Sequence, residues 1–267
     1  MNKYLRKATL LGSALVLGLS LMVGGCSTDD TPPTTTGIAL PGQGVTVDPA
    51  RPTWDTGYFQ TEIIIQALKE LGYNVTNPVS LGNSPFFEAV ANGDVDFWAD
   101  GWFPQHSIYM QGKESKEQIV GNLIQSGALQ GFMIDKATAD QYNITSVAQF
   151  ADPDIAALFD IDGDGKAEMV ACPPGWGCEL MIDHMFAAYG LNATVDLTKA
   201  DYTLSMVDAL ARYQNGESIF YYAWTPNWTA DSLVAGKDVV WLEVPFTSLP
   251  AEQQQFMDAT FVANLVG

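Results

Sequence analysis

The sequence has few of the residues on which metal centres and nucleic-acid binding depend. Its 267 residues include only two histidines, His106 and His184, and three cysteines. Structural zinc sites need about four Cys or His ligands at short spacings, so these numbers argue against a zinc centre. Only 12 Lys and Arg stand against 31 Asp and Glu, which gives a formal net charge of −19. Nucleic-acid binding needs a basic surface, so the composition excludes nucleic-acid partners and weakly favours a cationic ligand.

The sequence also lacks the patterns that mark common hydrolases. It contains no G-x-S-x-G motif, no H-E-x-x-H motif and no Cys/His nucleophile arrangement. The alternative of an exported hydrolase with paired carboxylates is supported only by the abundance of Asp and Glu. We therefore expect neither an enzyme nor a cofactor.

No apolar run is long enough to span a membrane comfortably. The run at 8–23 follows Lys3, Arg6 and Lys7, and its length suits the core of a signal peptide. It ends in L-M-V-G-G-C at Cys26, where small residues before a cysteine are typical of lipoprotein processing. We expect a lipoprotein signal peptide at 1–25, lipid on Cys26 and a flexible tether at 26–40, on a protein facing the periplasm or the cell exterior. The alternative is a plain signal peptide followed by a free cysteine.

The other two cysteines enclose the most informative loop of the chain. With Cys26 lipidated, Cys172 and Cys178 form an even pair in an oxidising compartment, so we expect a disulfide between them. The loop reads C-P-P-G-W-G-C and leads into a helical pattern. Backbone N–H groups at a helix start attract anions, so Gly177 and Cys178 could hold a carboxylate beside the aromatic face of Trp176, which suits a zwitterion. The alternative is a stapled surface loop whose tryptophan only fills a core.

The chain after the tether alternates helical and strand patterns, which predicts an α/β fold. Caps, apolar spacing and terminal glycines predict helices at 61–71, 84–93, 178–189 and 202–215, and strands at 73–76, 95–99, 132–135, 194–197, 219–224 and 239–244. We expect two lobes, at 41–130 and 131–250, with a ligand cleft between them.

Three predicted strand ends carry or approach a tryptophan. They contain D-F-W-A-D-G-W up to Trp102, the loop with Trp176, and F-Y-Y-A-W-T-P-N-W with Trp224. Ligands of open α/β sheets bind beyond the carboxyl ends of strands, and several aromatic faces around one point suit a quaternary ammonium group. The remaining four tryptophans are expected to be core residues: Trp54, Trp98, Trp228 and Trp241.

The same segments resemble the glycine betaine/proline betaine substrate-binding proteins of ABC-type importers. The resemblance runs from Leu40 to about Pro250 and includes L-P-G-Q-G-V-T-V, A-N-G-D-V-D-F with W-F-P-Q-H, C-P-P-G-W-G-C-E and F-Y-Y-A-W-T-P-N-W. It implies a type II periplasmic-binding-protein fold that delivers a betaine to permease subunits for osmoprotection. It further implies site residues with two roles. A tryptophan box around the trimethylammonium group comprises Trp102, Trp176 and Trp224, and the carboxylate is held by the N–H groups of Gly177 and Cys178 with the His106 side chain.

Two features qualify this expectation. Members of the resembled family continue well beyond Pro250, whereas this chain ends at Gly267. We therefore expect 251–267 to be a shortened return segment and the first lobe to be incomplete. A sugar or another small solute stacked on the same tryptophans is the alternative ligand, although the site segments are poor in the Asn, Asp and Arg that bind sugars.

The segment D-I-D-G-D-G-K-A-E resembles the first half of a calcium loop. Asp160, Asp162 and Asp164 fit the pattern, but Ala171 stands where a bidentate Glu should fall. An Asp- and Gly-rich turn without a metal is therefore the expected structure.

Overall fold

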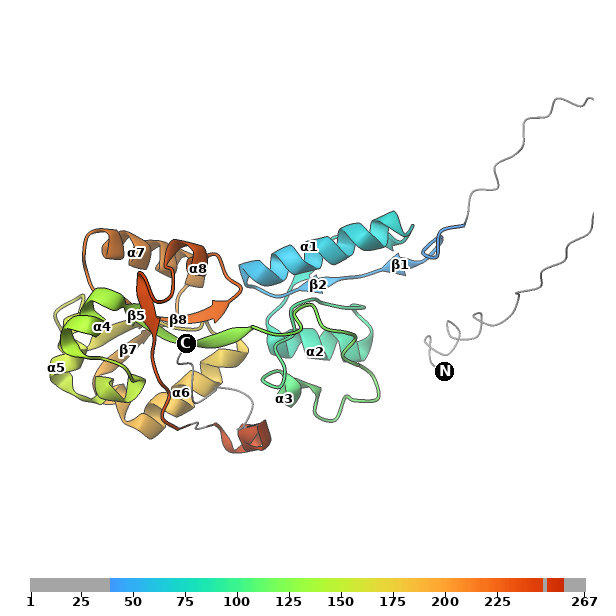
Figure 1. Ribbon diagram of the computed structural model, residues 1–267. Helices are drawn as coiled ribbons and strands as arrows, with labels where there is room; N and C mark the ends of the chain where they lie inside the picture. Colours follow the sequence, from blue (N-terminus) through green and yellow to red (C-terminus); the bar gives the residue numbers. More distant parts are fainter. Residues whose placement is uncertain (1–38, 247–248, 257–267) are drawn as a thin grey trace, which may run out of the picture. The chain divides into compact units, whose positions relative to one another are not determined.

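The computed structural model describes residues 39–246 and 249–256 (Figure 1). The predicted signal peptide, Cys26, nearly all of the tether and most of the predicted return segment lie outside these described residues. Within the described ranges, no helix has both the length and the apolar character needed to cross a membrane.

Residues 39–128, here called the N-terminal part, contain two short parallel strand pairs. β1 (Thr46–Val47) pairs with β3 (Asn74–Val75), and β2 (Ala50–Arg51) pairs with β4 (Val79–Ser80). The helices are α1 (Asp55–Glu70), α2 (Asn83–Asn92) and α3 (Ser107–Met110). A small core of Ala50, Phe86, Phe87 and Val95 lies between these elements.

The predicted strand at 95–99 is wrong as a continuous strand. Phe97 makes only an isolated parallel bridge to Pro49. Proline has no N–H group to donate to a ladder, and the chain turns at Asp100, whose φ is 68°. The segment therefore passes along the sheet edge and then bends toward Trp102.

Residues 129–246, here called the C-terminal part, surround a five-stranded sheet with the order β7-β6-β8-β5-β9. The strands are β5 (Leu129–Asp135), β6 (Ala167–Val170), β7 (Val195–Thr198), β8 (Phe220–Thr225) and β9 (Val239–Trp241). The helices are α4 (Lys136–Tyr142), α5 (Pro153–Ala156), α6 (Gly177–Tyr189), α7 (Tyr202–Gln214) and α8 (Thr229–Ser232), with 3-10 turns at Val147–Ala151, Ala157–Phe159, Leu191–Ala193 and, further on, Ala251–Phe256. β8 is apolar and buried along nearly its whole length, as a central strand covered on both faces requires.

Strand direction brings the functional segments to one edge of this sheet. β6 and β8 are parallel, so the chain after β6, with Trp176, and the end of β8, with Trp224, share an edge. β5 runs antiparallel to β8, and its second residue, Gln130, is the register partner of Trp224. The start of β5 and the ends of its neighbours therefore meet at one place.

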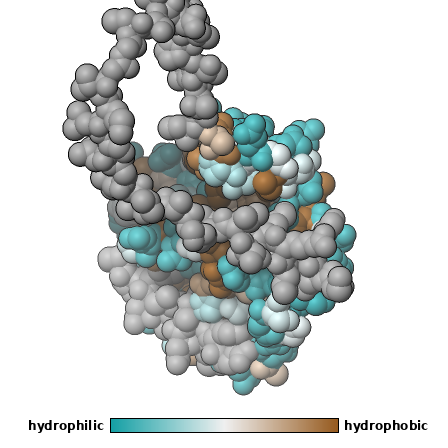
Figure 2. All heavy atoms as spheres, turned by 90° about the vertical axis from the view of Figure 1, so that its right-hand side faces the viewer, coloured by the Kyte–Doolittle hydropathy of each residue, from teal (hydrophilic) through white to brown (hydrophobic). Residues whose placement is uncertain are grey.

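The surface of the N-terminal part mixes hydrophobic and hydrophilic residues. Figure 2, which views the molecule from the right-hand side of Figure 1, shows brown residues interspersed with teal ones. On α1, Phe59 and Ile63 are among the most exposed large apolar side chains. Single exposed apolar residues are common on protein surfaces and need no special explanation.

Candidate functional site

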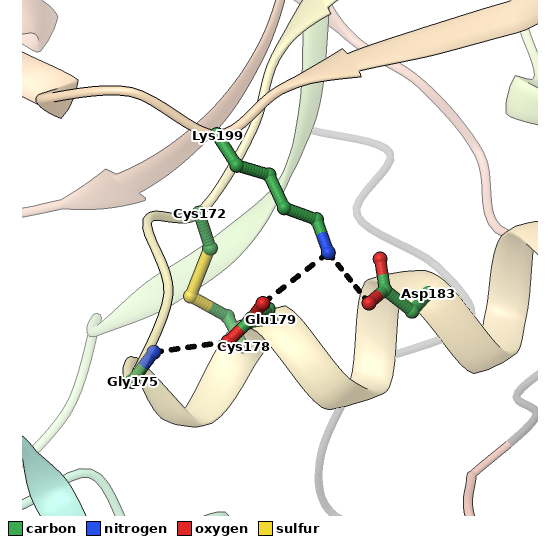
Figure 3. A network of polar contacts seen from close by, with 6 residues as sticks. All are labelled: Cys172, Gly175, Cys178, Glu179, Asp183 and Lys199. Carbon is green, nitrogen blue, oxygen red and sulfur yellow. Dashed lines mark hydrogen bonds and ion pairs between the residues drawn. A yellow bond between two sulfur atoms is a disulfide. The ribbon is translucent and has the colours of Figure 1, made fainter.

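The predicted disulfide is present and shapes the start of α6. Cys172 and Cys178 are bonded, with their Cα atoms 6.0 Å apart. Inside the loop, the Gly175 N–H donates to Glu179 Oε2 at 2.9 Å (Figure 3). Lys199 Nζ lies 3.3 Å from Glu179 and 2.6 Å from Asp183. The lysine thus offsets one of two negative charges close to a helix start, which weakens their repulsion of an anion.

The first N–H groups of α6 are open to a ligand. Trp176 is the N-cap residue and makes no side-chain cap. Glu179 N–H donates to the Trp176 carbonyl, whereas Gly177 and Cys178 N–H have no acceptor among the described residues. Both residues line a cavity. Unpaired donors at the positive end of a helix are suited to a carboxylate.

All six predicted ligand-binding residues line this one cavity, which has a free volume of about 30 Å³ in this structure. Its full lining comprises Trp54, Trp102, Gln105, His106, Gln130, Trp176, Gly177, Cys178, Tyr222 and Trp224. The ring centroid of Trp176 lies 5.5 Å from that of Trp224 and 5.4 Å from that of Trp54. The cavity therefore has aromatic walls beside free backbone donors, which suits a ligand with a diffuse cation and an anion.

The prediction that Trp54 is only a core residue is wrong, because Trp54 is buried and also lines the cavity. Trp98 instead stacks on Phe86 with centroids 4.1 Å apart, and neither it nor Trp228 nor Trp241 lines the cavity. Nothing in the local sequence around Trp54 distinguishes it from a core tryptophan. Its place depends on contacts with residues far along the chain.

Sequence reasoning also missed a chain of polar groups at the cavity. The Tyr222 hydroxyl donates to Gln130 Oε1 at 2.7 Å, and Gln130 Nε2 donates to Gln105 Oε1 at 2.9 Å. This chain links the sheet to the W-F-P-Q-H segment of the N-terminal part. In the sequence, only the position of Gln105 next to His106 indicates that it could line the cavity. For Gln130 there is no such indication, because its place at the cavity follows from the antiparallel pairing of β5 with β8.

His106 is buried and neutral. Burial lowers the pKa of His106 to about 3. Its Nδ1 accepts from the Trp102 N–H at 3.1 Å, so the ring hydrogen resides on Nε2, which lies 3.0 Å from the Asn83 amide. Asn83 Oδ1 is buried without a partner, and turning the amide over gives Nε2–H its acceptor. His106 is thus a single neutral donor rather than a positive charge.

We predict that His106 makes the fold sensitive to acid. Its folded pKa lies below the unfolded value of about 6.5, so below that pH the unfolded state takes up a proton that the folded state does not. Stability is therefore lost as the pH falls from about 6.5 toward 3, with about 2 kcal/mol lost between pH 7 and pH 5. Urea unfolding of wild type and His106→Gln at both pH values measures this contribution. The carboxylates are the same in both proteins, so they contribute equally to any loss of stability in acid. Equal losses of unfolding free energy in wild type and His106→Gln would therefore contradict the role of His106.

Two other features of the C-terminal part lie away from the aromatic cavity. A hollow of about 370 Å³ between β6 and α7 is lined by no aromatic residue. It borders the Asp- and Gly-rich loop, where carboxylate oxygens of four residues come within 4.8 Å of one another: Asp160, Asp162, Asp164 and Glu168. Glu168 was not predicted, and the loop's own N–H groups donate to these carboxylates. The segment forms an Asp- and Gly-rich turn, and the absence of a metal there stays a prediction.

Comparison with known proteins adds the family context. Residues 45–264 match the family described as the substrate binding domain of ABC-type glycine betaine transport system. The glycine betaine/proline betaine-binding periplasmic protein of Salmonella typhimurium is 44% identical over 216 residues, which cover 80% of this chain and 65% of that protein. The chain thus spans slightly less than two thirds of that relative's length.

Solved structures show the same fold. The glycine betaine, L-proline-binding protein ProX of Borrelia burgdorferi is similar with a TM-score of 0.62 and 18% identity, covering 75% of this chain and 69% of that chain. Lactococcal OpuAC in its closed form with glycine betaine gives 0.59 and 21%, covering 75% and 71%. These likenesses confirm the predicted fold class, a two-lobed α/β binding protein.

Proposed function

Because this chain belongs to the family of substrate-binding domains of ABC-type glycine betaine transport systems, we propose that it is a receptor for glycine betaine or proline betaine. The family binds substrates for transport and is not a family of enzymes. One observation carries the proposal. Four tryptophans line a cavity that also contains the two free N–H groups at the start of α6.

The proposed binding mode follows from the charges of a betaine. The trimethylammonium group lies against Trp102, Trp176 and Trp224, because it offers no hydrogen-bond donor and is attracted by aromatic faces. The carboxylate accepts from the N–H groups of Gly177 and Cys178, and it replaces the Asn83 amide as the partner of His106 Nε2. This arrangement places each end of the zwitterion beside groups of opposite polarity.

The cellular setting is proposed on the sequence and the relatives together. The curated relatives are periplasmic, and the basic, apolar and G-G-C pattern before Cys26 supports export with a lipid on that cysteine. Lobes at 41–130 and 131–250, followed by a return segment from 251, would then close on the betaine and present it to permease subunits, serving osmoprotection. Membrane fractionation tests the anchor: Cys26→Ser should move the protein to the soluble fraction, and an unchanged membrane-bound fraction would contradict it.

Tryptophan fluorescence tests the ligand class. Purified protein is titrated with glycine betaine, proline betaine, choline and a neutral hexose. We expect saturable changes in indole emission with the two betaines, because their cations approach the cavity rings. A response to the sugar alone, or to none of the compounds, would contradict the proposal.

The disulfide should matter more for binding than for stability. The bonded cysteines are only 6 positions apart, and closing so small a loop stabilises the fold by about 2 kcal/mol. The bond nevertheless fixes the loop that carries Trp176 and leads into the two N–H groups. We expect reduction, or the Cys172→Ser/Cys178→Ser pair, to lower betaine affinity while the far-UV circular dichroism stays nearly unchanged. Unchanged affinity after verified reduction would show that the loop holds its shape without the bond.

A further inference from the structure

The carboxylate of Asp100 is linked to two of the indole N–H groups around the cavity. Trp54 Nε1 donates to Asp100 Oδ2 at 2.6 Å. Trp224 Nε1 donates at 3.3 Å to Thr56 Oγ1, which in turn donates to Asp100 Oδ2 at 3.0 Å. Two of the four cavity tryptophans are thus linked to a single carboxylate, Trp54 directly and Trp224 through one hydroxyl.

This carboxylate is buried without a cation. Asp100 is 7% exposed, and no Lys, Arg or His nitrogen among the described residues lies within 4.0 Å of it. Burial raises the pKa of Asp100, while the hydrogen bonds from Trp54 and Thr56 oppose that rise. An ionised group removed from water and left unpaired is costly unless a ligand supplies the opposite charge.

The carboxylate does not line the cavity itself, but it accepts from the ring N–H of Trp54, which does line it. An indole that donates its N–H to a carboxylate is polarised toward a more negative ring, which strengthens its attraction for a cation. The charge of Asp100 and the ring faces therefore act on the same end of a ligand.

We propose that Asp100 is the counter-charge that makes this cavity selective for a quaternary ammonium group, an inference that rests on the betaine binding proposed above. Asp100 acts from behind the wall and also fixes the orientation of the rings. The charge of Asp100 can be tested separately from its hydrogen bonds. An asparagine at this position removes the charge but keeps an oxygen that can accept from Trp54 and Thr56.

The test compares two ligands of the same shape. Glycine betaine carries a quaternary nitrogen, and tert-butylacetate carries a carbon in its place, with the same carboxylate. Asp100→Asn is well suited to the site, since asparagine tolerates the positive φ of 68° and can turn its amide oxygen toward Trp54 and Thr56. Asp94→Asn is the matched control: it changes the net charge equally, in the same segment, at an exposed side chain.

Calorimetric titration should show that Asp100→Asn weakens glycine betaine binding by about tenfold and leaves tert-butylacetate binding unchanged within about twofold. Asp94→Asn should change neither. The thermal midpoint of Asp100→Asn should stay the same or rise, since a buried charge is removed.

Equal weakening of both ligands would overturn the inference, because that is the result of a purely structural role. Unchanged affinity for both would also overturn it. Both results leave the proposed function intact. If the wild-type protein fails to bind glycine betaine at all, the proposed function fails and this inference fails with it.

Discussion

Replacing Trp176 or Trp224 with alanine should weaken glycine betaine binding by about tenfold or more. Each ring lost from a desolvated cage removes about 0.5 to 2 kcal/mol of cation–π attraction, and the cavity also loses its shape. Both tryptophans are nearly fully buried and line the cavity. Trp54→Ala should also weaken binding, because the structure places Trp54 in the same wall.

Phenylalanine at the same positions is the control. Trp176→Phe and Trp224→Phe retain an aromatic face and most of the buried volume, so they should lose less affinity than the alanine variants. Calorimetry on variants with verified cooperative unfolding gives the comparison. If both alanine variants bind glycine betaine with wild-type affinity, the prediction of a tryptophan cage is wrong.

Gly177→Ala should reduce betaine affinity by about 10- to 100-fold, since overpacking a close contact costs about 1–3 kcal/mol. A Cβ atom at Gly177 would lie 2.6 Å from Gln105 Nε2, 2.9 Å from Asn83 Nδ2 and 3.1 Å from His106 Cδ2. These three groups are buried and have little room to yield. The methyl group would therefore displace the loop whose N–H groups we propose to hold the carboxylate.

Gly82→Ala is the matched control for this prediction. Gly82 lies against the same loop, but a Cβ atom there would meet only the Gly175 carbonyl, at an ordinary 3.5 Å. Its φ of −72° is open to alanine. We expect near wild-type binding, measured by calorimetry alongside Gly177→Ala. Equal affinities in the two variants would show that the closeness around Gly177 has no role in binding.

The helices that carry clear end signals were predictable from sequence. α6 was expected to start at 178 and starts at Gly177, and it ends before Gly190 in a left-handed conformation, as predicted. α7 begins after Asp201, whose side chain accepts from the Leu204 N–H. α1 begins six residues before its predicted start, since its N-cap, Trp54, provides no capping side chain. Caps and terminal glycines are local signals, so they can be read without the fold.

Elements set by tertiary contacts were harder to predict. The strand β6 was missed, and it directly follows an Asp- and Gly-rich turn that gives no strand signal. On α6, the apolar side chain of Leu180 is 46% exposed, and Met181 takes the buried position instead. A one-residue shift in the apolar face of a helix depends on the neighbours against which it packs.

The candidate site also contains some residues that could be predicted from the sequence and others that could not. Trp176, Gly177 and Cys178 could be predicted from the loop and helix start that they form, and Trp224 from its place at a strand end. Trp54 and Asp100 could not, since their hydrogen bond joins residues 46 positions apart. The sequence thus predicted the ring faces and the anion site, but not the carboxylate that gathers the ring N–H groups.

A crystal structure of the protein with glycine betaine would show where each end of the ligand binds. We expect the trimethylammonium group among Trp102, Trp176 and Trp224, with carboxylate oxygens about 2.7–3.2 Å from the backbone nitrogens of Gly177 and Cys178. A betaine bound outside this cavity, or bound within it with its carboxylate turned toward Asp100, would show that the proposed binding mode is wrong.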